Sequence, residues 1–113
     1  MTNKTIEYSD FEKIKMATGT ILEVKINAKA RKPSYIIKID FGPKIGIKTS
    51  SAQITNYSTE ELINKQIIGV INFEKKNIAG IESEVLILGA ISKDNSIFLL
   101  NADKNLINGL PIA

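Results

Sequence analysis

Residues 19–41 read GTILEVKINAKARKPSYIIKIDF, which is two strand patterns joined by a polar, basic loop. In the first pattern three apolar residues share one face: Leu22, Val24 and Ile26. In the second pattern four residues do so: Tyr35, Ile37, Ile39 and Phe41. Alternation of apolar and polar residues with a period of two is typical of a strand with one buried face. The stretch therefore predicts two strands of a small antiparallel barrel.

The next segment predicts a third strand. Gly42-Pro43 is a turn signal, and in residues 44–50 the apolar positions Ile45 and Ile47 are expected to point inward. Lys38 and Lys48 are then expected on the outward faces of neighbouring strands.

A short helix and two further strands follow. Ser58 and Glu61 have the spacing of a capping box, which predicts a helix that ends before Asn64. Residues 66–73 and 84–91 have strand patterns. Three strands, a helix and two strands are the element order of the OB-fold, a five-stranded Greek-key barrel. We therefore predict an all-β protein, an OB-fold barrel with short flanking helices.

The fourth and fifth strands are apolar on both faces. One face of the fourth carries Ile67, Ile71 and Phe73, and one face of the fifth carries Val85, Ile87 and Ile91. The opposite faces are apolar as well: Ile68, Val70, Leu86, Leu88 and Ala90. In a small barrel the outer face is normally polar, so these strands are expected to be covered, in part by residues 97–100 and for the rest by a subunit interface.

The chain is expected to form one domain, residues 1–113. Ser9 and Glu12 have capping-box spacing, which predicts a helix over about 9–15; the barrel then spans about 17–91 and a C-terminal extension about 92–113. The N-terminus has no apolar signal region, and no apolar run approaches the ~20 residues that span a bilayer. A cytoplasmic protein without membrane insertion is expected.

Missing residue types exclude several kinds of site. The sequence has neither cysteine nor histidine, which rules out disulfides, thiolate nucleophiles and thiolate- or imidazole-bound zinc. Glu82 and Glu84 could share a strand face at a spacing that suits a weak cation site, but no other ligand converges on them. We expect no metal, no cofactor and no catalysis, and we expect Glu84 to accept backbone hydrogen bonds or to pair with a lysine.

Basic residues are concentrated in one part of the chain. Between Lys25 and Lys48 there are seven basic residues and one acid, Asp40, a local charge of +6 within a net charge of +3. Such a patch attracts phosphate backbones and other polyanions. A solvated lysine surface would give the same pattern, so charge alone leaves both alternatives open.

Several segments carry a family resemblance: AxGTIxEVxxxxKARKPSYxxKIDFG, IKTSSAQIT, LINKQIIGVINF and IAGIESEVLILG. Over about residues 11–111 the chain resembles the CsaA-like proteins, small stand-alone members of the tRNA-binding-domain superfamily. The resemblance implies a non-catalytic OB-fold homodimer. CsaA-like proteins are export-related chaperones that bind unfolded or secretory polypeptides, whereas the wider superfamily binds tRNA.

For RNA binding, the resemblance points to Asn72 at the end of the fourth strand, to Lys75 and Lys76, and to Ser83-Glu84. Arg31 lies in the loop that matches a CsaA motif, and its guanidinium suits phosphate or carboxylate. The full candidate set also includes Lys38, Lys48, Ser50 and Ser51. The sequence departs from the RNA-binding pattern of the family at two places. Asn77 stands where relatives often have a basic residue, and Val85-Leu86 replaces a small residue followed by Met.

For polypeptide binding and dimerisation, the candidates are the outer apolar residues of the last two strands: Ile68, Val70, Leu86, Leu88 and Ala90. Phe41 and Phe73 are expected in the core, while Tyr35 and Tyr57 are expected to be freer. Two free tyrosines do not make the aromatic groove of a general single-strand binder. The prediction is a CsaA-like chaperone acting as a homodimer, with a structure-specific tRNA-binding protein as the alternative.

Overall fold

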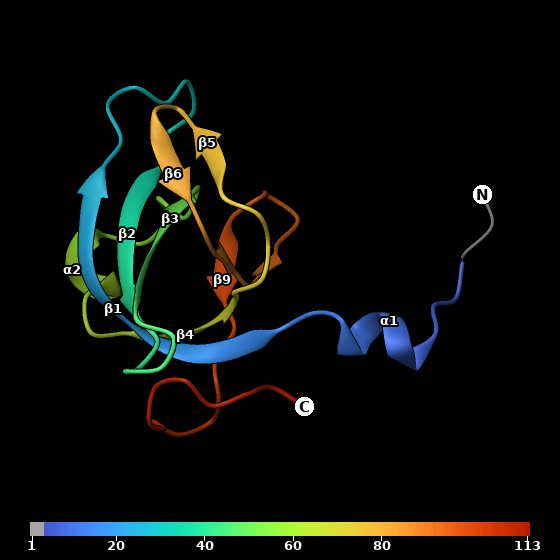
Figure 1. Cartoon of the computed structure of the whole chain (residues 1–113). Helices are drawn as coiled ribbons and strands as arrows, with labels where there is room; N and C mark the ends of the chain where they lie inside the picture. The colour runs from blue at the N-terminus through green and yellow to red at the C-terminus, as the bar shows by residue number, and fades with distance from the viewer. Residues whose placement is uncertain (1–3) are drawn as a thin grey trace.

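The computed structural model describes residues 4–113 and contains a five-stranded antiparallel sheet that curls into a barrel (Figure 1). The strand order is β3-β2-β1-β4-β7. The strands are β1 (Met16–Ile26), β2 (Tyr35–Asp40), β3 (Ile47–Ala52), β4 (Gln66–Val70) and β7 (Leu86–Ile87). Helix α2 (Thr59–Leu62) lies between β3 and β4, as the OB-fold requires. The predicted fold class is confirmed.

The fifth predicted strand is not continuous. Residues 84–91 contain β7 and then β8 (Gly89–Ile91), which leaves the barrel and pairs with β9 (Ile97–Leu99). Before them, β5 (Lys76–Ile78) and β6 (Ile81–Ser83) form a hairpin that rises above the barrel (Figure 1). Its two-residue turn, Ala79-Gly80, has positive φ at both positions, the geometry that suits the twist of a hairpin.

Strand β2 and Phe41, which follows it, contribute the largest share of the core. Tyr35, Ile37, Ile39 and Phe41 are all buried, as the alternating pattern predicts. The expectation that Tyr35 is freer is therefore wrong: its ring is in the core, and its hydroxyl donates to the Tyr57 carbonyl at 2.9 Å. Close approach of β1 and β4 to Phe41 requires glycine, because an added Cβ at Gly19 would lie 2.8 Å from the Phe41 ring and one at Gly69 would lie 3.0 Å from it. The core therefore depends on an aromatic ring held between two glycines.

The predicted inward face of β1 is wrong in part because the strand contains a bulge. The register with β2 shifts between Ile21 and Glu23. Ile21 is fully buried, whereas Leu22 and Ile26 are exposed. The extra residue of a bulge moves the side chains that follow it to the other face. Val24 stays packed against the core, but its partner there is Ile21 rather than Leu22.

Strand β3 also differs from the prediction. Ile47 is 60% exposed instead of inward, and the buried residue of this strand is Ser50. Lys48 lies opposite Ile39, and directly paired residues share a face, so Lys48 is on the inner side of the sheet rather than the outer one. Lys38 lies opposite Thr49, on the outer face. The two lysines are therefore on opposite faces.

Strand β4 has a buried residue on its second face. Val70 is only 4% exposed in the single chain, and Ile68 is half-buried. Val70 is therefore covered by its own chain and does not contribute to an exposed subunit interface, which corrects its place among the interface candidates.

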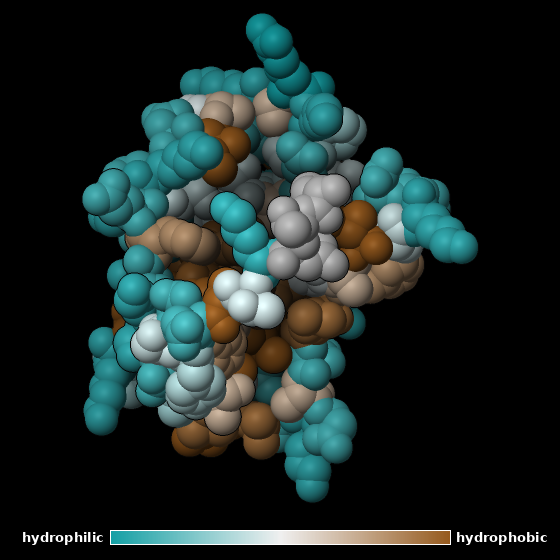
Figure 2. All heavy atoms as spheres, turned by 90° about the vertical axis from the view of Figure 1, so that its right-hand side faces the viewer, coloured by the Kyte–Doolittle hydropathy of each residue, from teal (hydrophilic) through white to brown (hydrophobic). Residues whose placement is uncertain are grey.

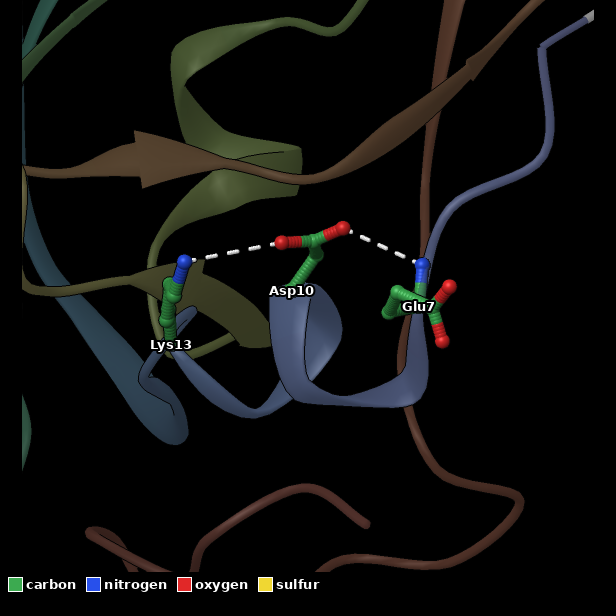
Figure 3. Close-up of polar contacts among 3 residues, drawn as sticks. All are labelled: Glu7, Asp10 and Lys13. Carbon is green, nitrogen blue, oxygen red and sulfur yellow. Dashed lines mark hydrogen bonds and ion pairs between the residues drawn. The ribbon is translucent and has the colours of Figure 1, made fainter.

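The N-terminal helix α1 (Tyr8–Glu12) begins one residue earlier than predicted and projects from the barrel (Figure 1). Its N-cap is Glu7 rather than Ser9. The Asp10 carboxylate accepts a hydrogen bond from the Glu7 N–H at 3.1 Å and lies 3.5 Å from the Lys13 ammonium (Figure 3). None of its residues is buried. Within residues 4–113 no helix is long and apolar enough to cross a membrane.

The C-terminal segment is tied across the barrel by two side chains. Gln66 donates from Nε2 to the Leu106 carbonyl at 2.6 Å and accepts from the Leu106 N–H at 3.0 Å. Thr18 Oγ1 donates to the Ile107 carbonyl and accepts from the Leu110 N–H. Both side chains belong to buried residues of the barrel, Gln66 and Thr18, so buried groups hold this segment against the sheet.

Candidate functional site

The barrel closes where residues 83–85 run beside β3. The Glu84 N–H donates to the Thr49 carbonyl at 2.8 Å, and the Ser50 hydroxyl donates to the Val85 carbonyl at 2.8 Å. Ser83 Oγ accepts from the Ser51 N–H at 3.1 Å. Side chains therefore supply part of the bonding that a regular strand ladder would supply, and they fix the base of the β5–β6 hairpin.

Glu84 is the centre of this seam. Its Oε2 accepts from the Thr49 N–H at 3.0 Å, and its Oε1 lies 3.7 Å from Lys75 Nζ and 3.9 Å from Lys48 Nζ. The side chain is 21% exposed, so these interactions are partly protected from solvent. Glu84 accepts a backbone hydrogen bond and pairs with lysines, as predicted, and it neutralises part of the charge of two candidate RNA contacts.

Three other RNA candidates are engaged within the chain. Ser50 and Ser83 bond the barrel seam described above. Asn72 accepts from the Lys15 N–H at 2.9 Å and donates to the Lys13 carbonyl at 2.8 Å. Asn72 therefore holds the segment after α1 against the end of β4. Their polar atoms serve the fold, and a ligand would have to compete with these bonds.

The basic candidates do not form one cluster. Lys48, Lys75 and Lys76 lie around the β5–β6 hairpin, and Arg31 is in the loop of residues 27–34, which borders the same hairpin at Ile78 and Ala79. Lys38 is on the outer face of β2, where its ammonium lies 4.0 Å from Glu23. Lys25 also pairs with Glu23 at 2.9 Å, and this hydrogen bond is the main reason that the pKa of Glu23 lies below its ordinary value.

A concave pocket lies between the hairpin and the barrel seam. We call it the apolar pocket; its volume is about 560 Å³. Its apolar lining is Phe73, Ile78, Val85 and Leu86, and the polar residues around it are Ser51, Glu74, Lys76, Ser83 and Glu84. Figure 2 views the molecule from the side of β5 and α1, where brown apolar residues lie in a hollow among hydrophilic ones.

Two large side chains at this pocket are more than half exposed. Phe73 is 59% exposed and Leu86 is 51% exposed. Phe73 was expected in the core, and this expectation is wrong because β4 ends at Val70, before the alternation reaches it. The signal available in the sequence was Asn72, a residue that commonly ends a strand.

The remaining interface candidates do not lie on one common surface. Leu86 lines the apolar pocket, Leu88 is half-buried, and Ala90 is exposed on β8. Ala90 lies directly opposite Phe98 of β9, which is also exposed. The β8–β9 hairpin therefore presents a second apolar surface.

Comparison of the sequence with protein families gives one match that covers most of the chain. The model of the family described as "Putative tRNA binding domain" matches residues 16–111. The methionine–tRNA ligase of Pyrococcus horikoshii is 36% identical over 108 residues, which are 95% of this chain and 14% of that protein. The methionine–tRNA ligase of Flavobacterium psychrophilum is 34% identical over 87% of this chain and 14% of that protein. The chain thus spans about a seventh of the length of these relatives.

Two solved structures are similar over nearly their whole length. The CsaA chaperone protein from Picrophilus torridus is 52% identical, with a TM-score of 0.92 over 96% of this chain and 100% of that chain. The chaperone CsaA from Bacillus anthracis str. Ames is 39% identical, with a TM-score of 0.91 over 97% of this chain and 100% of that chain.

Proposed function

Because the chain belongs to the tRNA-binding domain family, and within it to the CsaA-like proteins, we propose that it is a polypeptide-binding chaperone. In this proposal the apolar pocket receives apolar side chains of unfolded polypeptides, including segments that await export. The chaperone description of the two similar solved proteins supports this choice. The proposal involves no catalytic step.

The observation that carries the proposal is the exposure of Phe73 and Leu86 beside a concave apolar surface. A pocket of about 560 Å³ is within the usual range for ligand sites. Burying one large apolar side chain contributes about 1.5–3 kcal/mol, so a single anchor gives weak, reversible binding. Weak binding of apolar segments is what a protein that releases its clients needs.

A homodimer is part of the proposal. Its proposed interface is the β8–β9 hairpin, because Ala90, Phe98 and Ile91 are exposed apolar residues on this element. The apolar pocket is lined by Leu86 of β7 and by residues that precede it in the sequence, and it includes no residue of the β8–β9 hairpin. Two subunits would then offer two pockets, and a polypeptide that engages both gains affinity through the raised effective concentration.

Binding of tRNA is the second candidate function. It is supported by the family match and by the basic residues of the hairpin and of loop 27–34. The engagement of Ser50, Asn72, Ser83 and Glu84 within the chain counts against the RNA set as a whole. In this candidate Arg31, Lys75 and Lys76 supply phosphate contacts, and the protein recognises RNA mainly by shape.

The substitution Phe73→Ser tests the proposed site. We expect it to weaken binding of a fluorescent, permanently unfolded polypeptide about tenfold, because an exposed apolar anchor is lost. Binding of tRNA should not change. The control is Ile107→Ser, which removes an apolar residue outside this pocket that is more exposed than Phe73, 73% against 59%. Equal effects of the two substitutions on polypeptide binding would overturn the assignment of the site.

A further inference from the structure

A second pocket, of about 500 Å³, adjoins the apolar pocket. Ser51 and Ile78 line both, so the two pockets are neighbours. The second pocket is lined on its other side by loop 27–34, including Arg31, Lys32 and Ser34. We call it the basic pocket.

The cationic groups of the basic pocket have no acidic partner. Ion pairs within residues 4–113 involve Lys13, Lys25, Lys38, Lys48 and Lys75, but not Arg31 or Lys32. Loop 27–34 contains no acidic residue. Lys29 of the same loop extends toward the hairpin turn, where its Nζ would lie 3.8 Å from a Cβ added at Gly80. Three positive charges therefore lie in one loop beside the pocket.

The same loop also holds two buried donors without acceptors. Ser34 is 3% exposed and Asn27 is 5% exposed, and neither Ser34 Oγ nor Asn27 Nδ2 has a hydrogen-bond partner. The two residues are joined by a bond from the Asn27 N–H to the Ser34 carbonyl at 3.0 Å. A buried polar atom without a partner is costly and calls for an explanation such as a bound water or ion, and of the two residues only Ser34 lines the basic pocket. The hydroxyl hydrogen of Ser34 is free to rotate.

The chemistry of the loop therefore suits an anion, and the pocket beside it suits an apolar group. An occupant that spans both must carry an apolar side chain and a negative charge a short distance apart. A polypeptide segment with both types of side chain satisfies this condition. RNA fits less well, because Phe73 is the only aromatic ring of either pocket, whereas RNA modules stack successive bases on several rings. The planar guanidinium of Arg31 can bind a carboxylate through two parallel hydrogen bonds.

We infer that the basic pocket is a subsite for the side-chain carboxylate of an Asp or Glu in the bound polypeptide. The inference rests on the proposed function and specifies it further. The protein selects apolar segments that have an acidic residue close to the apolar anchor. Arg31 binds the carboxylate, while Lys29 and Lys32 add a favourable field and Ser34 lines the site.

Paired peptides test this selectivity. Each amidated peptide of a series has a Phe-Leu anchor and one Glu at a different distance from it, and its partner has Gln in place of Glu. We expect the best-placed Glu to raise affinity about fivefold over Gln, the upper range for a partly exposed ion pair. The substitution Arg31→Gln should abolish this preference and leave the Gln peptides unaffected. Lys104→Gln is the control, because it removes the same charge at an exposed residue that lines neither pocket.

The possible failures are distinguishable. If Glu and Gln peptides bind the unaltered protein equally well, the basic pocket is not a carboxylate subsite, although the proposed polypeptide binding stands. If no peptide binds, the proposed function and the subsite both fail. If Arg31→Gln weakens tRNA binding but leaves the Glu preference intact, the loop is an RNA contact and the inference is overturned.

Discussion

At the scale of single residues, Glu84 makes several interactions that connect different parts of the fold. Its carboxylate accepts from the Thr49 N–H and lies between two lysines, and its own N–H bonds the Thr49 carbonyl. The residue therefore joins the hairpin, the barrel seam and the charge around the apolar pocket. A change at Glu84 should affect stability as well as binding.

Substitution of Glu84 by alanine removes the acceptor and leaves the Thr49 N–H without a side-chain partner. We expect the free energy of unfolding to fall by about 1–2 kcal/mol, the typical cost of losing a partly buried hydrogen-bond partner. Urea denaturation measures this change. The control is Glu82→Ala on the exposed residue two positions earlier, for which a change within about 0.5 kcal/mol is expected. Equal losses for the two variants would contradict the anchoring role.

The role of Glu84 could be predicted from the sequence, whereas the exposure of Phe73 could not. The anchoring role of Glu84 was predictable, because a carboxylate between lysines at the start of a strand has few other partners. The exposure of Phe73 was not, because alternation continues through residues 66–73 in the sequence whereas the strand ends at Val70. Beyond the strand, Asn72 bonds the backbone at Lys13 and Lys15, a contact between segments distant in the sequence that the alternation does not indicate.

At the scale of elements, local signals predicted α2 and the buried face of β2 correctly, whereas the capping box predicted at Ser9 and Glu12 is absent because Glu7 and Asp10 cap α1. The capping box of α2 is present, with the Ser58 N–H donating to Glu61 at 2.8 Å and the Glu61 N–H donating to Ser58 Oγ at 3.1 Å. The alternation of β2 predicted its buried face correctly. The faces of β1 were mispredicted because a bulge inserts one residue into the register, and neither composition nor period indicates where a bulge occurs.

The cap of α2 predicts a pH dependence. Hydrogen bonds from Ser58, first from its backbone N–H, lower the pKa of Glu61 below its ordinary value. Because the folded-state pKa is the lower one, the stabilisation is complete above the unfolded-state pKa and is lost as the pH falls through the folded-state pKa. An NMR titration of the Glu61 carboxyl carbon should show this lowered pKa.

The matched variant for this titration is Ser58→Ala. It removes the hydroxyl and should move the pKa of Glu61 toward its ordinary value, while the loss of the N-cap should destabilise the protein by about 1 kcal/mol. Because the backbone N–H of residue 58 remains, an unchanged titration curve would contradict the contribution of the Ser58 hydroxyl to the lowered pKa.

At the scale of the whole molecule, the fold separates two apolar surfaces. The apolar pocket uses Phe73 and Leu86, whereas the β8–β9 hairpin exposes Ala90 and Phe98. The sequence predicted outer apolar residues on the last two strands but combined them into one face. The two surfaces could not be told apart from the sequence, because residues 84–91 have the pattern of one continuous strand. In the structure this stretch is divided into β7 and β8, and the chain changes direction between them.

This separation predicts that assembly and polypeptide binding can be altered independently. Ala90→Lys places a charge on the proposed interface and should convert a dimer to monomers in sedimentation velocity, with unchanged circular dichroism. A typical stable interface buries about 800 Å² per partner, and an unpaired charge at its centre is costly. Phe73→Ser should leave the dimer intact. A dimer that persists in Ala90→Lys would place the interface elsewhere.

The most direct test of the proposed function is the salt dependence of polypeptide binding in competition with tRNA. We predict that affinity for an unfolded, apolar polypeptide changes by less than about threefold between ~50 and ~200 mM salt, because apolar burial supplies the binding energy. Excess tRNA should displace little of the bound polypeptide. If affinity for the polypeptide is undetectable while tRNA binds and loses about a hundredfold in affinity over the same salt range, the protein is a tRNA-binding protein and the chaperone proposal is contradicted.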